Sequence, residues 1–132
     1  MQLETRQAQL FMQVYNQWSS RDSVKAFARI RYGDFEWTDL EDFMEKYGPG
    51  NPDAFADQLT MNHFFDGLGV LVKKGLIDIS LVRDLFSQRI IWFWERNKDT
   101  FYELRIFTGD PTQYYHIEYL YHELKKLEII VP

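Results

Sequence analysis

Few residues in this sequence have types and spacings suited to acid–base or metal chemistry, and histidine is the sparsest of them. His122 follows Glu118 by four residues, which places both on one side of a helix, and His63 precedes Asp66 by three. A carboxylate-bridged metal centre in a helical bundle needs Glu-x-x-His pairs on two helices. The sequence contains no Glu-x-x-His, because the step from Glu118 to His122 is one residue too long. We therefore expect no metal and no cofactor.

Nucleophilic and phosphate-binding motifs are also missing from the sequence. There is no cysteine, no Gly-x-Ser-x-Gly, no dinucleotide-binding glycine pattern and no Walker loop. Gly67 and Gly69 fall inside a predicted helix, where they favour a close helix crossing over a phosphate contact. Asp78 lies in a loop that lacks the alternating oxygen ligands of a calcium site. These observations predict no catalytic residues and a protein that is not an enzyme.

A basic stripe gives two interpretations. Arg21, Lys25 and Arg29 follow one side of a predicted helix, where they could bind an anion or form an ordinary solvated face. We favour the solvated face. The net charge of −5 argues against nucleic acid, and the helix after Asp78 is too apolar to lie in a DNA groove.

Arg89 is the most informative polar residue, because helical spacing places it inside an apolar arc that includes Leu85 and Phe86. A buried guanidinium must be paired and hydrogen-bonded. The expected partner is Asp66, ahead of Glu118. The pair would either fix the helix register, which we favour, or line a pocket for an anionic ligand.

A second candidate site is a surface on the last predicted helix. Tyr115, Tyr119 and His122 share a side that differs from the expected core stripe. Tyrosine is enriched where proteins meet, because it offers a large ring with a polar tip. These residues therefore predict a homodimer or partner surface, unless the first helix or the apolar tail Ile129–Val131 covers them.

Hydrophobic periodicity predicts the elements that position these residues, namely an all-α single domain over residues 1–132. We expect a helical bundle of about four longer helices with one or two short ones. The expected helices cover about residues 3–18, 20–32, 38–47, 52–74, 79–97 and 111–127, with a further short helix that Asn97 or Asp99 starts and Gly109 ends. The expected N-caps are Ser20, Thr38, Asn51, Asp78 and Asp110.

The stretch from residue 62 to residue 97 forms the centre of this arrangement, because it carries the densest run of apolar side chains. Gly75 ends one long helix and Asp78 begins the next, so the two should pack antiparallel. The residues expected to be largely buried are Phe65, Leu68, Val82, Phe86, Ile90, Phe93, Ile117 and Leu124.

Length and composition set the remaining limits. The 132 residues suffice for one core without disulfides or metals, and 17% of them are aromatic. No run of residues approaches the roughly 18 apolar residues of a membrane span. We expect a cytoplasmic protein, since the lack of cysteine fits a reducing compartment.

Two stretches resemble a prokaryotic family of uncharacterised helical domains. The segment FFDGLGVLVKKGLIDISLVRDLF, followed by IIWFWE and ELR, carries the resemblance between residues 62 and 105, and TRQAQLFMQVYNQW adds to it. The resemblance implies a helical fold and no known activity. It also implies that a longer form could be tethered at the cytoplasmic face of a membrane by an N-terminal transmembrane helix, which this chain lacks.

The sequence leaves two functions open. The first is a non-enzymatic interaction or scaffolding module with a protein partner or a second copy of itself. The second is a domain that senses a small molecule or nucleotide, with a pocket near Arg89. A cavity beside an unpaired Arg89 would favour sensing, and a filled core with Arg89 paired would favour scaffolding.

Overall fold

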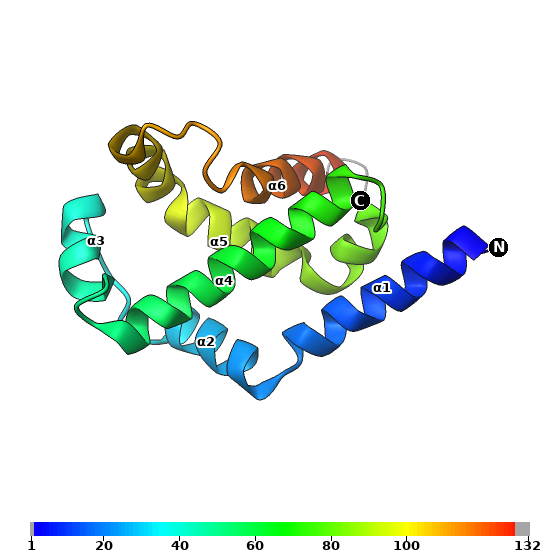
Figure 1. The fold of residues 1–132 in the computed structure, drawn as a ribbon, viewed down its shortest axis with the longest axis horizontal. Coiled ribbons are helices and arrows are strands. Elements are labelled where there is room, and N and C mark those ends of the chain that lie inside the picture. The colour runs from blue at the N-terminus through cyan, green and yellow to red at the C-terminus, as the bar shows by residue number, and fades with distance from the viewer. Residues whose placement is uncertain (1, 129–132) are drawn as a thin grey trace.

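The computed structural model describes residues 2–128, and its regular structure is α-helical throughout (Figure 1). The helices are α1 (Gln2–Trp18), α2 (Arg21–Tyr32), α3 (Leu40–Tyr47), α4 (Pro52–Lys73), α5 (Ile79–Thr108) and α6 (Tyr115–Glu128). The all-α prediction is confirmed. The apolar tail at residues 129–131 lies outside the described residues. No helix between residues 2 and 128 combines the length and the apolar character needed to cross a membrane.

Helix α5 is one continuous helix of 30 residues, so the predicted break near Asn97 is wrong. Asn97 resembles a helix start in sequence, but its side chain is buried and donates to the Phe93 carbonyl oxygen one turn back at 2.9 Å. A buried amide that bonds within its own helix supports that helix and does not begin a new one. Gly109, with a φ of 73°, then ends α5.

The turn between α4 and α5 follows the prediction. Gly75 has a φ of 75°, which glycine adopts without strain, and Asp78 caps α5 by accepting from the Ser80 backbone N–H at 2.8 Å. Leu76, the residue after Gly75, is 46% exposed.

Helices α4 and α6 cross at Gly69. A Cβ atom at this position would overlap the backbone carbonyl of His116, so only glycine permits the observed approach. Gly67 faces open space and takes no part in the crossing. The predicted role of a close crossing is therefore confirmed for Gly69 and wrong for Gly67.

The core forms where α1 ends against the α4–α5 pair. The Trp18 ring lies 5.3 Å from the Phe64 ring, 5.8 Å from Phe65 and 5.5 Å from Phe86, between ring centres. All eight residues predicted to be largely buried are buried, none of them more than 2% exposed. Figure 1 shows the N-terminal half of α1 extending beyond the α4–α5 turn. Trp18 is the last residue of α1, at the end that packs on the core.

Candidate functional site

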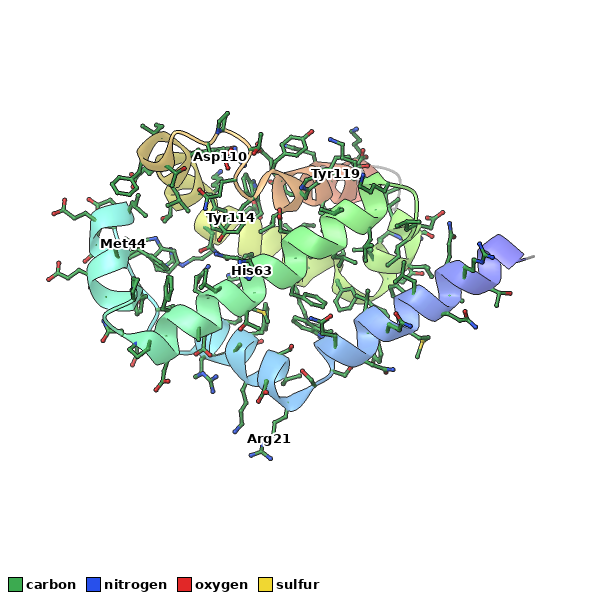
Figure 2. The ribbon with its side chains drawn as sticks, in the orientation of Figure 1. Arg21, Met44, His63, Asp110, Tyr114 and Tyr119 are labelled. Atoms are coloured by element: carbon green, nitrogen blue, oxygen red, sulfur yellow. The ribbon has the colours of Figure 1, made fainter. Side chains whose placement is uncertain are left out.

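A cavity of about 190 Å³ lies among α3, α4, α5 and the segment before α6. Its apolar walls come from aromatic and aliphatic side chains, namely Phe43, Met44, Phe55, Phe101, Leu40, Leu59 and Leu104. Its polar lining comes from Gln58, Asn62, Asn97, Thr100, Gln113 and Tyr114. In Figure 2, Met44 marks the α3 wall and Tyr114 marks the wall formed by the segment before α6.

Three buried amides form the polar end of the cavity. The Gln58 Nε2 on α4 donates to the Asn62 Oδ1 at 2.8 Å and to the Asn97 Oδ1 on α5 at 3.2 Å. The three residues are 3%, 4% and 1% exposed, respectively. Since buried amides need partners, this network joins the two central helices at one defined register.

Gln58 carries an acceptor that the network does not satisfy. Its Oε1 is buried and has no hydrogen-bond partner among the described residues. An unsatisfied buried acceptor costs about 1–3 kcal/mol. This oxygen has almost no accessible surface, so it lies in the packed interior behind the cavity wall.

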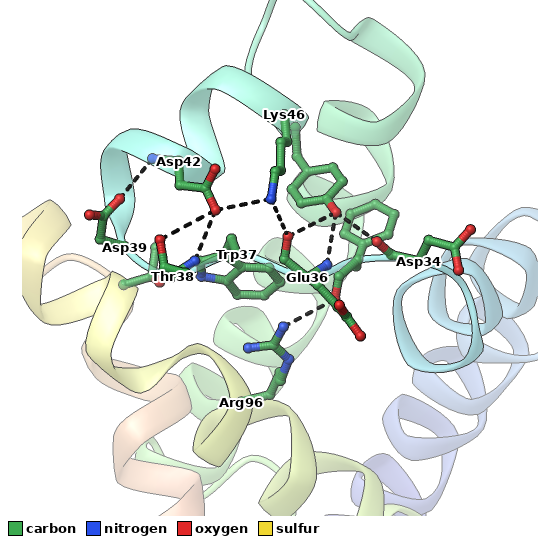
Figure 3. A network of polar contacts seen from close by, with 11 residues as sticks. Asp34, Glu36, Trp37, Thr38, Asp39, Asp42, Lys46 and Arg96 are labelled. Atoms are coloured by element: carbon green, nitrogen blue, oxygen red, sulfur yellow. Dashed lines mark hydrogen bonds and ion pairs between the residues drawn. The ribbon is translucent and has the colours of Figure 1, made fainter.

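The α3 wall is held in place by the chain before it (Figure 3). The Arg96 guanidinium on α5 donates to the Phe35 carbonyl oxygen at 3.0 Å and lies 3.8 Å from the centre of the Trp37 ring. The Trp37 indole N–H donates to the Thr100 hydroxyl at 2.6 Å, and its ring meets the Phe43 ring at 4.9 Å. Trp37 thus couples two lining residues, Thr100 and Phe43.

Helix α3 begins one residue later than predicted. Asp39, and not Thr38, is the N-cap, accepting from the Asp42 backbone N–H at 2.8 Å. The Asp42 carboxylate accepts from the Thr38 backbone N–H at 2.9 Å and pairs with Lys46 at 3.1 Å (Figure 3). These bonds lower the pKa of Asp42, the Thr38 N–H contributing most.

The far end of α3 is tied to α4 by Asn51. The predicted position of Asn51 before α4 is confirmed, but its side chain makes no cap bond there. Its Nδ2 instead donates to the carbonyl oxygens of Glu45 at 3.2 Å and Lys46 at 2.8 Å. These carbonyls lie in the last turn of α3, where the helix itself supplies no donor.

The segment before α6 forms the fourth wall. The predicted cap Asp110 accepts from the Thr112 backbone N–H at 2.9 Å, but a turn intervenes and α6 begins only at Tyr115. Tyr114 takes a φ of 57°, which turns the chain into α6. Its ring lies 4.9 Å from the Phe101 ring, so both residues meet at the cavity.

The predicted pairing of Arg89 is wrong. Arg89 is exposed, its guanidinium donates to the Leu85 carbonyl oxygen at 2.8 Å, and it lies 5.6 Å from the Trp18 ring centre. The assumption that failed was a buried Leu85, which is 41% exposed, so the apolar arc is narrower than the sequence suggested. Arg89 does line a groove on the surface, together with Arg31 and Trp92, but this groove is open and separate from the amide-lined cavity.

The carboxylates expected to pair with Arg89 have other partners. The Asp66 Oδ1 accepts from the His116 backbone N–H at 3.1 Å, which fixes the start of α6 against α4. Glu118 pairs with Arg105 on α5 at 2.9 Å, with side chains 20% and 13% exposed, respectively. Glu118 is therefore paired with a different arginine of α5, sixteen residues after Arg89.

Tyr115, Tyr119 and His122 make some of their contacts within the chain itself. The Lys73 ammonium on α4 lies 4.4 Å from the Tyr115 ring centre and 5.5 Å from that of Tyr119. Tyr115 remains 39% exposed, and the His122 Nε2 lies 3.8 Å from a Glu118 oxygen. The partner surface therefore stays a prediction, now with Lys73 as an added member.

The basic residues of α2 show both behaviours that the sequence allowed, because two of them face solvent and one binds an anion. Arg21 and Lys25 are exposed. Arg29 forms two hydrogen bonds to the carboxylate of Asp57 on α4, at 2.5 and 2.6 Å. Asp57 is only 7% exposed. The anion that Arg29 binds is therefore a buried carboxylate of the same chain.

Sequence reasoning missed Gln58 and Asn97, although one signal was present. Asn62 follows Phe55 and Leu59 along one face of the same helix, so a polar side chain occupies a position that apolar spacing assigns to the interior. A polar residue inside an apolar stripe indicates a buried hydrogen-bond network. The partner on α5 required the structure, since spacing within one helix gives no register between helices.

The fold and the cavity together define a small all-α domain with an amide-lined cavity between its central helices. A model of the family described as "Domain of unknown function (DUF4760)" matches residues 4–124, so the chain belongs to this family. Neither the curated proteins nor the solved structures include a significant match.

Proposed function

We propose that this domain is a non-enzymatic module that binds a small molecule in the cavity between α3, α4 and α5. The observation that carries the proposal is the lining of this cavity, in which aromatic and aliphatic walls meet three buried amides. Apolar walls with a few polar groups are typical of ligand sites.

The lining also supports binding without catalysis. It consists of apolar, amide and hydroxyl side chains, and the described lining residues include no histidine, carboxylate, lysine or arginine. Such groups orient a ligand, whereas general acid–base or nucleophilic catalysis needs groups that titrate or are activated. The proposal moves the expected sensing pocket from Arg89 to Gln58 and keeps the cytoplasmic location expected from the sequence.

Native mass spectrometry of protein purified from its own host tests the proposal. We expect a small molecule to accompany the natural chain and the Met12→Trp variant, and to be lost from the Met44→Trp variant. Met44 at the cavity and Met12 on α1 are both exposed, at 43% and 52%, so the two substitutions are matched. An equal amount of the molecule in both variants would place it outside the cavity and contradict the proposal.

A protein-interaction role is the second candidate, and one observation favours it. Ile106 and Phe107, in the last turn of α5, are 83% and 81% exposed, which is unusual for adjacent large apolar residues. The expected partner is a second copy of the chain. Sedimentation velocity of an Ile106→Ser, Phe107→Ser variant should show loss of self-association, and a Tyr115→Glu, Tyr119→Glu variant tests the α6 surface in the same way.

Circular dichroism separates an interface from a folding defect in both variants. Unchanged helicity with lost association supports an interface. A natural chain that is monomeric at all concentrations would contradict self-association at either surface.

A further inference from the structure

The Asn62 side chain gives the cavity a hydrogen-bond donor of fixed orientation. Resting on the proposed binding function, we infer that the cavity takes an uncharged, largely apolar molecule with one carbonyl-type oxygen, held by the Asn62 Nδ2. The inference follows from the orientation of the buried amides, from the atoms of these amides that remain accessible, and from the charge and size of the cavity.

A chain of hydrogen bonds determines which end of each amide is nitrogen and which is oxygen. The Phe93 carbonyl oxygen can only accept, so the Asn97 side chain meets it with its Nδ2, at 2.9 Å. The Asn97 Oδ1 then faces Gln58, which must present its Nε2, and this Nε2 in turn requires the Oδ1 of Asn62. The end of Asn62 that remains is therefore the Nδ2, which can only donate.

The Asn62 Nδ2 is both unpaired and accessible. Two enclosed side-chain atoms of the described residues lack a hydrogen-bond partner, namely the Gln58 Oε1 and the Arg105 Nη2. The Asn62 Nδ2 also lacks a partner among these residues, but it is not enclosed. Because Asn62 is only 4% exposed and lines the cavity, we assign this accessible surface to the cavity. An acceptor on a ligand can therefore reach the Nδ2.

The other polar groups of the lining are compatible with an acceptor on the ligand. The Thr100 hydroxyl accepts from the Trp37 indole N–H at 2.6 Å, and its own hydrogen has no acceptor among the described residues. The Gln113 amide bonds a neighbouring hydroxyl that can donate or accept, and the Tyr114 hydroxyl has the same freedom. Asn62 and Thr100 thus offer one donor each, and the other two residues adapt to either role.

The charge and size of the cavity define the rest of the molecule. The described lining residues include no cationic and no anionic side chain, and an unpaired ion in such a site loses far more hydration than one hydrogen bond returns. A nucleotide, which the sequence left open, therefore does not fit this cavity. A cavity of about 150 Å³ is enough for benzene, so the volume of about 190 Å³ suits a small ring with a carbonyl group attached.

Acetophenone and ethylbenzene provide a matched pair of probes. They share a benzene ring and a two-carbon chain, but acetophenone has a carbonyl group where ethylbenzene has a methylene. Calorimetric titration measures both probes against the natural chain and against Asn62→Leu, in which a side chain of similar size has no donor. Asn62→Leu should weaken acetophenone binding about tenfold, since one hydrogen bond corresponds to roughly that factor, and should not weaken ethylbenzene binding. Asn16→Leu, at an exposed position of α1, should change neither affinity.

A nuclear magnetic resonance titration of the natural chain keeps the test valid if Asn62→Leu fails to fold. Acetophenone should shift the resonances of the Asn62 side-chain NH₂ group more than ethylbenzene does, because only acetophenone accepts its hydrogen bond. The Met44→Trp and Met12→Trp variants locate the probes, since Met44→Trp should lose the binding of both and Met12→Trp should keep it.

The outcomes separate this inference from the proposed function. Acetophenone binding that Asn62→Leu does not weaken, or Asn62 resonances that respond equally to both probes, overturns the acceptor inference and leaves the binding function in place. Failure of both probes to bind the natural chain contradicts the binding function itself.

Discussion

Gln58 and Asn97 are 39 residues apart in sequence, yet the Gln58 Nε2 donates to the Asn97 Oδ1 at 3.2 Å in the interior of the fold. This bond joins α4 and α5 where both helices line the cavity. A shift of either helix by one residue would separate the amides and leave each without its partner. The network therefore fixes the helix register and shapes the proposed site together.

A double-mutant cycle measures this coupling. Gln58→Met and Asn97→Leu should each lower the free energy of unfolding by about 1–3 kcal/mol, because each leaves a buried polar group unpaired. The double variant should lose less than the sum, with a coupling of about 0.5–3 kcal/mol. Urea unfolding of all four proteins gives the values. Strict additivity would show that the two side chains act independently.

The Phe86 ring should be among the most costly to remove. It is 1% exposed and touches the rings of Phe11, Trp18 and Phe64. Phe86→Ala is expected to cost about 3–5 kcal/mol in unfolding free energy. Phe107→Ala, at an exposed position of the same helix, should change stability by less than about 0.5 kcal/mol. A loss of stability below about 1 kcal/mol in Phe86→Ala would mean that the Phe86 ring is not enclosed in the core.

Two glycines on α4 should respond to alanine with opposite signs. Gly69→Ala should destabilise by about 1–3 kcal/mol, because the new Cβ meets the His116 carbonyl and must push α6 away. Gly67→Ala should stabilise by about 0.5–1 kcal/mol, since its Cβ enters open space and alanine favours a helix. Thermal unfolding of the two variants tests this. Stability changes of the same sign in both variants would show that the close crossing of α4 and α6 does not determine the effect of alanine.

Arg105 and Arg89 on α5 should differ in importance. Arg105→Met should cost about 1–3 kcal/mol, because Glu118 and the Gln113 carbonyl oxygen lose a donor in a partly buried setting. Arg89→Met should stay within about 0.5 kcal/mol, as for most exposed positions. Chemical denaturation of both variants decides the order. A larger loss of stability in Arg89→Met than in Arg105→Met would contradict this order and support the structural role that the sequence predicted for Arg89.

Acid should remove the contribution of Asp42. Its pKa is lowered in the folded chain, first by the Thr38 N–H and then by Lys46, so its carboxylate favours the folded state above the pKa of the unfolded chain. That contribution is lost as the pH falls through the lowered folded pKa. Asp42→Asn should therefore be less stable than the natural chain near neutrality, and the difference in stability should narrow as acid protonates the Asp42 carboxylate. A stability difference that does not change with pH would show that Asp42 acts through its hydrogen-bond geometry and not through its charge.

Local rules explain why the helices and the core were predictable. Ser20 and Asp78 satisfy the first N–H groups of α2 and α5, and both caps were evident from residue type and spacing. The buried positions, such as Phe65 and Phe93, followed from helical periodicity, because one wide apolar face has to be covered. These features depend on neighbours within a few residues along the chain.

The candidate site depended on distances between helices and was not predictable in the same way. Arg89 was expected to be buried because Leu85 is apolar, yet both side chains are exposed. Arg105 pairs with Glu118 only because α6 returns along α5. Gln58 meets Asn97 through a register that periodicity within one helix cannot set.

Because α5 is long, its two ends should differ in how their amide hydrogens become exposed to solvent. Thirty residues at 1.5 Å each make a rod of about 45 Å, held by the Trp18 cluster near one end and ending in the exposed turn at Ile106 and Phe107. Amide hydrogens near Phe86 and Ile90 should exchange with solvent only through global unfolding, whereas those of the last turn exchange through fraying. Thr100 and Phe101 lie between these two regions of α5 and line the cavity, so a ligand in the proposed site should slow the exchange of their amide hydrogens.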